Sequence, residues 1–264
     1  MTRAKKARQR RQQAAAPPPV RSTSGGRKAN PKVIAGVAAL IALAVIPAAI
    51  IFAVTGNDKS SSSTASKNTT TLPGAADVTR LFNGIPQHGN VLGSPSAPAT
   101  LVEYIDLQCP VCREFETTVM PSVVSRYVKT GKLKVVARLI AFLGPDSEVA
   151  RKAAVSALER NRFFDFAQLL YANQGTENSG WVTDQLVADA FASIPGINVD
   201  SAMAARNSAA VAREERRFDA QRDADHVLGT PTVLVGKNGG KLTEVAPGGS
   251  PTLAQLKAAI EKAQ

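Results

Sequence analysis

Two cysteines separated by two residues are the feature that most restricts what this chain can fold into. Cys109 and Cys112 are its only cysteines, and they lie where an apolar, strand-like run (100–107) gives way to a helix-like run (113–129). At such a junction one sulfur lies at a helix N-terminus, where unpaired backbone N–H groups and the helix dipole favour a thiolate. The pair therefore predicts thiol–disulfide exchange.

Two other uses of a closely spaced cysteine pair are weaker explanations. A zinc site needs three or four ligands, but the chain has no third cysteine, and His88 and His226 lie far apart in the sequence. We therefore expect no metal, and the sequence indicates no cofactor. A purely structural disulfide would close a very short loop and constrain the unfolded chain little, so it is the second alternative.

The strongly positive net charge of the chain comes from its N-terminal end. Ten of the 32 Lys and Arg residues lie in residues 1–32, which contain no acidic residue, and the other 22 are matched by 21 Asp and Glu residues. A basic tail without a hydrophobic pattern is typical of a disordered segment. Because the rest of the chain is nearly neutral, we expect no nucleic-acid partner. The alternative, a nucleic-acid-binding tail, would be confined to residues 1–32.

Residues 33–54 form a run of 22 residues without a charged side chain. About 20 apolar residues are enough to cross the hydrocarbon core of a membrane. The flanking Lys and Arg residues precede this run, so the positive-inside rule places residues 1–32 in the cytoplasm and the rest outside. We predict a single-pass signal anchor in the cell membrane. A cleaved secretory signal is the alternative, although the run is long and lacks a small-residue exit.

The remainder of the chain divides into a linker and one domain. Residues 55–75 are rich in Ser and Thr, which is typical of a flexible tether. Residues 76–264 are long enough to form one domain with its own core. A long helical stretch is expected at about 146–226. The other expected elements are strands at 100–107, 133–143, 232–235 and 241–246, and a final helix at 252–262.

This order of elements, with the cysteines directly after the first core strand, resembles the thioredoxin fold. The helical stretch before the last two strands resembles the insertion of the DsbA family of exported thiol oxidoreductases. The resemblance extends from about residue 84 to the C-terminus. The predicted fold class is therefore α/β, a thioredoxin-like fold with a large helical insertion, preceded by one transmembrane helix.

The resemblance assigns a role to each cysteine. In the family the first cysteine is the exposed nucleophile and the second resolves the mixed disulfide, which implies these roles for Cys109 and Cys112. The residues between them, Pro110 and Val111, form the active-site dipeptide. The family's strong oxidants often have a histidine there, so the Pro-Val dipeptide implies an oxidant of middling strength.

A proline at the start of a later strand is the second feature that carries the resemblance. Pro231 follows Thr230 and opens the strand at 232–235. Such prolines are common, but downstream of a Cys-x-x-Cys pair this one resembles the cis-proline loop that faces the active site in thioredoxin-like proteins. We predict a cis bond before Pro231 and substrate contact at Thr230, by strand-like backbone pairing. The alternative is an ordinary trans proline.

Glu103, six residues before Cys109, is the third feature. The family often has a buried acid at this spacing beneath the disulfide, where it relays the proton of the resolving cysteine. A carboxyl group in an apolar strand is expected to have a raised pKa, which suits this work. A strand residue that faces solvent or pairs with a base is the alternative, and Asp106 is a second candidate for the relay.

These predictions describe an extracytoplasmic thiol:disulfide oxidoreductase that introduces disulfides into exported proteins. The implied partners are unfolded or partly oxidised exported proteins and a membrane redox partner, a quinone-linked oxidase. Two alternatives stay open. One is a reductase or isomerase that runs the same chemistry in another direction, and the other is an exported peptide-binding or chaperone-like module with a non-catalytic disulfide.

Overall fold

The computed structural model of this protein describes residues 68–264. The predicted tail (1–32), the predicted transmembrane segment (33–54) and most of the predicted linker (55–75) lie outside the described residues. Between residues 68 and 264, no helix combines the length and the apolar composition that crossing a membrane requires. The predicted domain at 76–264 is described from end to end.

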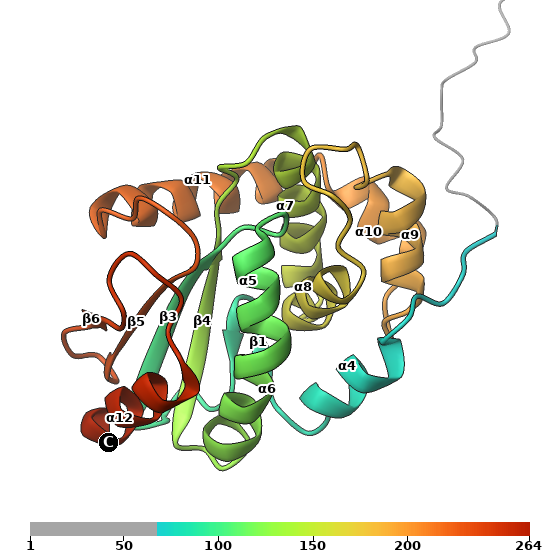
Figure 1. The fold of residues 1–264 in the computed structure, drawn as a ribbon. Helices are drawn as coiled ribbons and strands as arrows, with labels where there is room; N and C mark the ends of the chain where they lie inside the picture. The colour runs from blue at the N-terminus through green and yellow to red at the C-terminus, as the bar shows by residue number, and fades with distance from the viewer. Residues whose placement is uncertain (1–67) are drawn as a thin grey trace, which may run out of the picture. The chain divides into compact units, whose positions relative to one another are not determined.

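A six-stranded sheet in the order β1-β2-β4-β3-β5-β6 forms the centre of the domain (Figure 1). Strand β3 (Ala99–Ile105) lies in the middle of the sheet. It runs parallel to β4 (Leu133–Leu139) and antiparallel to β5 (Thr232–Lys237). These three are the strands predicted at 100–107, 133–143 and 232–235.

The strands at the two edges of the sheet differ more from the predicted elements than the three central strands do. The strand predicted at 241–246 is shortened to β6 (Thr243–Glu244). The opposite edge consists of β1 (Gln87–His88) and β2 (Val91–Leu92), and a helix, α4 (Ala75–Phe82), precedes them. None of these three was predicted. Two-residue strands leave no periodic pattern in a sequence, and α4 begins at the last residue of the predicted linker.

Every residue of β3 is buried, because both faces of the sheet are covered. Side chains alternate between the two faces along a strand. Leu101 and Ile105 belong to the large hydrophobic core, whereas Val102 and Tyr104 belong to a smaller cluster on the other face. The same alternation places Glu103 on the face of the large core.

A long helical segment runs across this face from Pro110 to Val128. It consists of α5 (Pro110–Glu114), η1 (Phe115–Val119), α6 (Met120–Val123) and η2 (Val124–Val128), where η1 and η2 are π-helical turns. The segment begins three residues earlier than the predicted helix. The final helix, α12 (Leu253–Ala263), packs on the same side, against β3, β5 and α6 (Figure 1).

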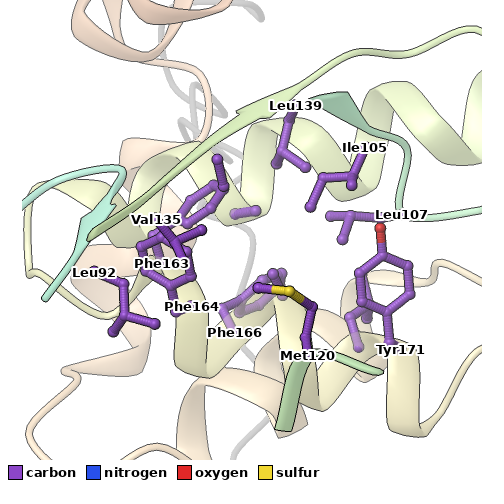
Figure 2. Packing of buried hydrophobic residues seen from close by; sticks show 14 of the residues in the cluster. Leu92, Ile105, Leu107, Met120, Val135, Leu139, Phe163, Phe164, Phe166 and Tyr171 are labelled. Atoms are coloured by element: carbon purple, nitrogen blue, oxygen red, sulfur yellow. The ribbon is translucent and has the colours of Figure 1, made fainter. Parts of the chain in front are cut away.

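The predicted helical insertion lies between β4 and β5. Its helices are α7 (Pro145–Leu158), α8 (Phe163–Ala172), α9 (Asp184–Ala192), α10 (Val199–Ala205) and α11 (Ala209–Ala224). Phe163, Phe164 and Phe166 of α8 belong to the same cluster of buried residues as Val135 of β4 (Figure 2). The insertion and the sheet therefore share one hydrophobic core.

The part of the predicted linker that the structure describes is packed on the insertion. The backbone N–H of Thr70 donates to a carboxylate oxygen of Asp189 at 2.8 Å. The backbone N–H of Leu72 donates to the Ser193 hydroxyl, also at 2.8 Å, and the Leu72 side chain packs against the core. These residues are attached to the domain rather than separate from it.

Candidate active site

Cys109 caps the N-terminus of α5. Its Sγ accepts a hydrogen bond from the backbone N–H of Cys112 at 3.3 Å. Pro110 occupies the first turn, where its missing N–H leaves no helical hydrogen bond unmade. Both cysteines are free thiols in this structure, and 6 % of Cys109 but none of Cys112 is exposed. Cys109 is thus the sulfur that a second molecule can approach.

The loop before β5 lies against this sulfur. The Thr230–Pro231 peptide bond is cis, as predicted. The Cys109 thiol donates to the backbone carbonyl of Thr230 at 3.5 Å. The fold thus brings Cys109, Thr230 and Pro231 together across 121 residues of sequence, at the positions where the sequence predicts the nucleophile and the substrate-contacting loop.

The surroundings shift the pKa values of the two thiols in opposite directions. A hydrogen bond from the Cys112 side chain is the main cause that lowers the pKa of Cys109, to about 6. Burial opposes this shift, while the Thr230 side chain and the backbone N–H groups of Cys112 and Val111 lower the pKa further. Burial raises the pKa of Cys112 well above its usual value, and the neighbouring Cys109 adds to this shift. At neutral pH the pair therefore holds one thiolate, at Cys109, and one thiol, at Cys112.

Glu103 is buried on the face of β3 that carries the large core, and a second acid, Glu116, lies beside it. Burial raises its pKa to about 7, against a side-chain hydrogen bond with Glu116 that lowers it. The pKa of Glu116 is raised well above its usual value by burial and by the charge of Glu103. Neither residue has an ion pair in the described part of the chain. Because a hydrogen bond between two carboxyl groups requires a proton on one of them, the two residues titrate as a pair.

Sequence reasoning missed Glu116. It lies in η1, close to the exposed residues Glu114, Thr117 and Thr118, so its surroundings resemble a solvated helix face. A signal was nevertheless present, because residues four apart share one face of a helix and Glu116 follows Cys112 by four. If Cys112 is buried against the sheet, Glu116 is expected to be buried one turn further along.

Asp106, the second candidate for the proton relay, holds the loops around the site together. Its carboxylate accepts hydrogen bonds from the Ser147 hydroxyl at 2.7 Å and from the backbone N–H of Gln108 at 2.9 Å. It also accepts from the backbone N–H groups of Phe142 at 2.8 Å and Leu143 at 3.3 Å. This carboxylate therefore joins the cysteine loop to the loop after β4.

The insertion is tied to the cysteine loop by further hydrogen bonds. The Tyr171 hydroxyl donates to the Asp106 carbonyl at 3.0 Å, and its ring lies beside Leu107 in the core (Figure 2). The Gln174 side chain donates to the carbonyls of Leu107 at 2.8 Å and Cys109 at 3.3 Å. These contacts hold the backbone that carries the reactive sulfur. No sequence motif predicts them.

The surface around Cys109 is apolar and hollowed. Val111, Phe142 and Leu228 are the exposed large hydrophobic residues of the described chain, and Leu228 is 95 % exposed. One hollow of about 630 Å³ lies between Val111 and the loop before β5, and another of about 450 Å³ opens beside Cys109.

Residues 68–264 contain no group of three or more His, Cys, Asp or Glu side chains placed to hold a metal ion.

Comparisons with known proteins agree with this arrangement. A family model described as thioredoxin matches residues 87–262. The chain is 27% identical over 150 residues to the probable disulfide bond formation protein D of Bacillus anthracis, covering 56% of this chain and 69% of that protein. It is 26% identical over 147 residues to disulfide bond formation protein D of Bacillus subtilis, covering 55% and 66%.

Solved structures are similar over a larger part of the chain. The oxidised form of BdbD from Bacillus subtilis superposes with a TM-score of 0.59 and 24% identity, covering 68% of this chain and 95% of that one. DsbA from Chlamydia trachomatis gives a TM-score of 0.56 and 21% identity, covering 66% and 90%. At these identities the structural likeness supports the predicted fold, a thioredoxin-like domain with a helical insertion.

Proposed function

This chain belongs to the thioredoxin family and is a thiol:disulfide oxidoreductase of the DsbA-like type, and we propose that it introduces disulfide bonds into exported proteins. The observation that carries the proposal is the placement of Cys109 at the cap of α5 with its pKa lowered to about 6. A stabilised thiolate stabilises the reduced enzyme, so the Cys109–Cys112 disulfide is an oxidant.

The exchange would proceed in two substitutions at sulfur. A substrate thiolate attacks Sγ of Cys109 in the oxidised enzyme, a substrate–Cys109 disulfide forms, and the Cys109–Cys112 bond breaks. A second substrate thiolate then attacks the substrate sulfur of this mixed disulfide and releases the Cys109 thiolate, a good leaving group because of its low pKa. The substrate loses two electrons to the cysteine pair.

Cys112 needs a proton during the first substitution. It leaves as a thiolate, and its pKa lies well above the usual value, so it takes up a proton at neutral pH. We assign Glu103, with its neighbour Glu116, to supply that proton. A carboxyl group with a pKa of about 7 holds a proton in part of the molecules at neutral pH and can release it.

The proposed location rests on the N-terminal sequence. Residues 33–54 would anchor the chain in the cell membrane, with residues 1–32 in the cytoplasm and the thioredoxin-like domain outside. That compartment permits stable disulfides. The substrates would be unfolded or partly oxidised exported proteins, whose extended segments pair with the backbone at Thr230. A quinone-linked oxidase in the membrane would restore the Cys109–Cys112 disulfide.

The reduction potential of the full-length protein tests the direction of electron flow. We expect a value near or above about −180 mV when the pair is equilibrated with glutathione. A value near about −270 mV would instead indicate a reductase, and a disulfide that resists reduction below about −300 mV would indicate a structural role.

Substitution of the nucleophile tests whether the chain works by exchange at all. Cys109→Ser is expected to reduce the oxidation of a reduced, unfolded protein at least about 1000-fold, because no mixed disulfide can form at the accessible sulfur. Cys112→Ser, the matched variant, is mixed with a protein that carries an exposed disulfide: the Cys109 thiolate attacks it, one substrate sulfur leaves as a thiolate, and the mixed disulfide accumulates because no second enzyme cysteine resolves it, which gel electrophoresis without reductant detects. Full function in the Cys109→Ser variant would instead favour a peptide-binding or chaperone-like module.

A further inference from the structure

The hollow of about 450 Å³ beside Cys109 lies between the helical insertion and the loop before β5. Phe142 and Leu143, from the loop after β4, and Leu228, from the loop before β5, make its walls largely apolar. Apart from Cys109, Glu177 is the one ionisable side chain among the described residues that line it. A single carboxylate therefore stands at the rim of an apolar hollow that contains the reactive sulfur.

The loop that carries Glu177 is held in place through the next residue, Asn178. The backbone N–H of Asn178 donates to Oε1 of Gln108 at 2.7 Å, and the Asn178 side-chain amide donates to the Leu143 carbonyl at 2.6 Å. The Asn178 side-chain oxygen accepts from the Gln108 amide at 3.2 Å. Gln108 is fully buried and directly precedes Cys109. The exposed loop that carries Glu177 is thus tied to the residue next to the nucleophile.

The charge of Glu177 is not neutralised by its surroundings. None of the ion pairs within residues 68–264 involves Glu177. The guanidinium of Arg222 lies 5.6 Å from the centre of the ring of Phe142, which lines the hollow. This guanidinium is already paired with Asp219 at 3.5 Å and Asp223 at 2.7 Å. The hollow therefore presents a negative charge to an incoming segment.

We propose that Glu177 selects substrates in which a Lys or Arg side chain lies close to the reacting cysteine. The inference rests on the proposed function, in which an extended substrate segment pairs with the backbone at Thr230. Such pairing would direct the residues on one side of the substrate cysteine into this hollow. A Lys or Arg there packs its aliphatic stem against Phe142 and Leu228 and places its charge at Glu177, whereas an acidic residue is repelled.

Matched peptides with a single cysteine test the proposal on the oxidised full-length protein. Each peptide carries Lys, Gln or Glu either two residues before or two residues after the cysteine. The rate of mixed-disulfide formation is measured by acid quenching and mass spectrometry. At low salt we expect the Lys peptide to react about fivefold faster than the Glu peptide for one of the two positions. At 1 M salt this ratio is expected to fall below about twofold.

Variants of Glu177 separate recognition from intrinsic thiol reactivity, since a nearby Lys also raises the thiolate fraction of a peptide. Glu177→Gln is expected to lower the Lys-to-Glu rate ratio at least about twofold, and Glu177→Lys is expected to lower it further. The exposed Glu159, at the end of α7 and outside the hollow, offers the control Glu159→Gln, which is expected to keep the wild-type ratio.

Failure of this inference can be told apart from failure of the proposed function. The pKa of Cys109 is expected to stay unchanged in Glu177→Gln, because Glu177 is not among the groups that shift it. Equal rates for the Lys and Glu peptides, or a wild-type ratio in Glu177→Gln, would overturn the inference while leaving the proposed function intact. Sluggish exchange with every peptide would overturn both.

Discussion

Glu103 and Tyr104 are neighbours on β3, and their side chains lie on opposite faces of the sheet. The buried polar group has a charged network of partners on one face and only a second acid on the other. On the face of Tyr104, its hydroxyl donates to Asp225 at 2.6 Å and accepts a hydrogen bond from Arg138, which also pairs with Asp225 at 2.8 Å. On the face of Glu103, the carboxyl group meets a second acid, Glu116, and no cation.

This difference in partners makes the Tyr104 network a structural feature and the Glu103–Glu116 pair a group that can exchange a proton. Burial and Asp225 raise the pKa of Tyr104, so the phenol stays protonated and the group of three is complete at any physiological pH. The acid pair of Glu103 and Glu116 lacks a compensating charge, which lowers stability but leaves a proton that is released near neutral pH. Only the second face lies under the active-site helix.

The largest expected effect concerns the pH dependence of stability on the acidic face. Burial raises the pKa of Glu103 from 4.5 to about 7, so its stabilising contribution is complete below about pH 4.5 and is lost as the pH rises towards 7. This loss amounts to about 3 kcal/mol. The combined Glu103→Gln and Glu116→Gln substitution is expected to remove it, as urea unfolding at pH 4.5 and 7.5 measures.

A Cys109→Ser background keeps this measurement free of the thiolate. The lowered pKa of Cys109 contributes stability that is complete above about pH 9 and is lost as the pH falls through about 6, which is the opposite trend. If the double carboxamide variant kept the full decline between pH 4.5 and 7.5, the decline would have another source and the comparison of the two faces would fail.

On the opposite face, Arg138→Met is expected to destabilise the protein by about 2 kcal/mol, because Asp225 and the Tyr104 hydroxyl lose their cation. The loss is expected to be similar at pH 5 and pH 8, and the rate of disulfide exchange is expected to stay within about twofold of wild type. Arg138→Lys serves as the matched control that keeps the charge. A fall of more than tenfold in the exchange rate of Arg138→Met would show that this face also takes part in the chemistry.

The smallest effect is expected for Tyr104→Phe, which removes one hydroxyl and leaves the Arg138–Asp225 pair in place. We expect a loss of about 1 kcal/mol in the free energy of unfolding, as for a single hydrogen bond. Urea unfolding of Tyr104→Phe, Arg138→Met and the double variant also measures the coupling of the two residues. Fully additive losses would contradict a joined network.

The features that sequence reasoning found are those with a local signal. The Cys109–Cys112 pair and the proline after Thr230 each lie in a short motif, and the fold brings them together as predicted. Glu103 was proposed only from its spacing to Cys109 in the family resemblance. Glu116 and Asn178 were missed, because their roles depend on which groups tertiary packing places beside them. No periodicity in the sequence indicates that an exposed loop is bound to Gln108.

The attachment of Thr70 and Leu72 to α9 has a practical consequence for making a shortened protein. A fragment cut at residue 76, the predicted domain boundary, would leave Asp189 and Ser193 without the N–H groups that they accept from, and would uncover the core where Leu72 packs. A fragment that starts at residue 68 or earlier keeps these contacts. It is therefore the better choice for crystallisation and for titrating the two thiols.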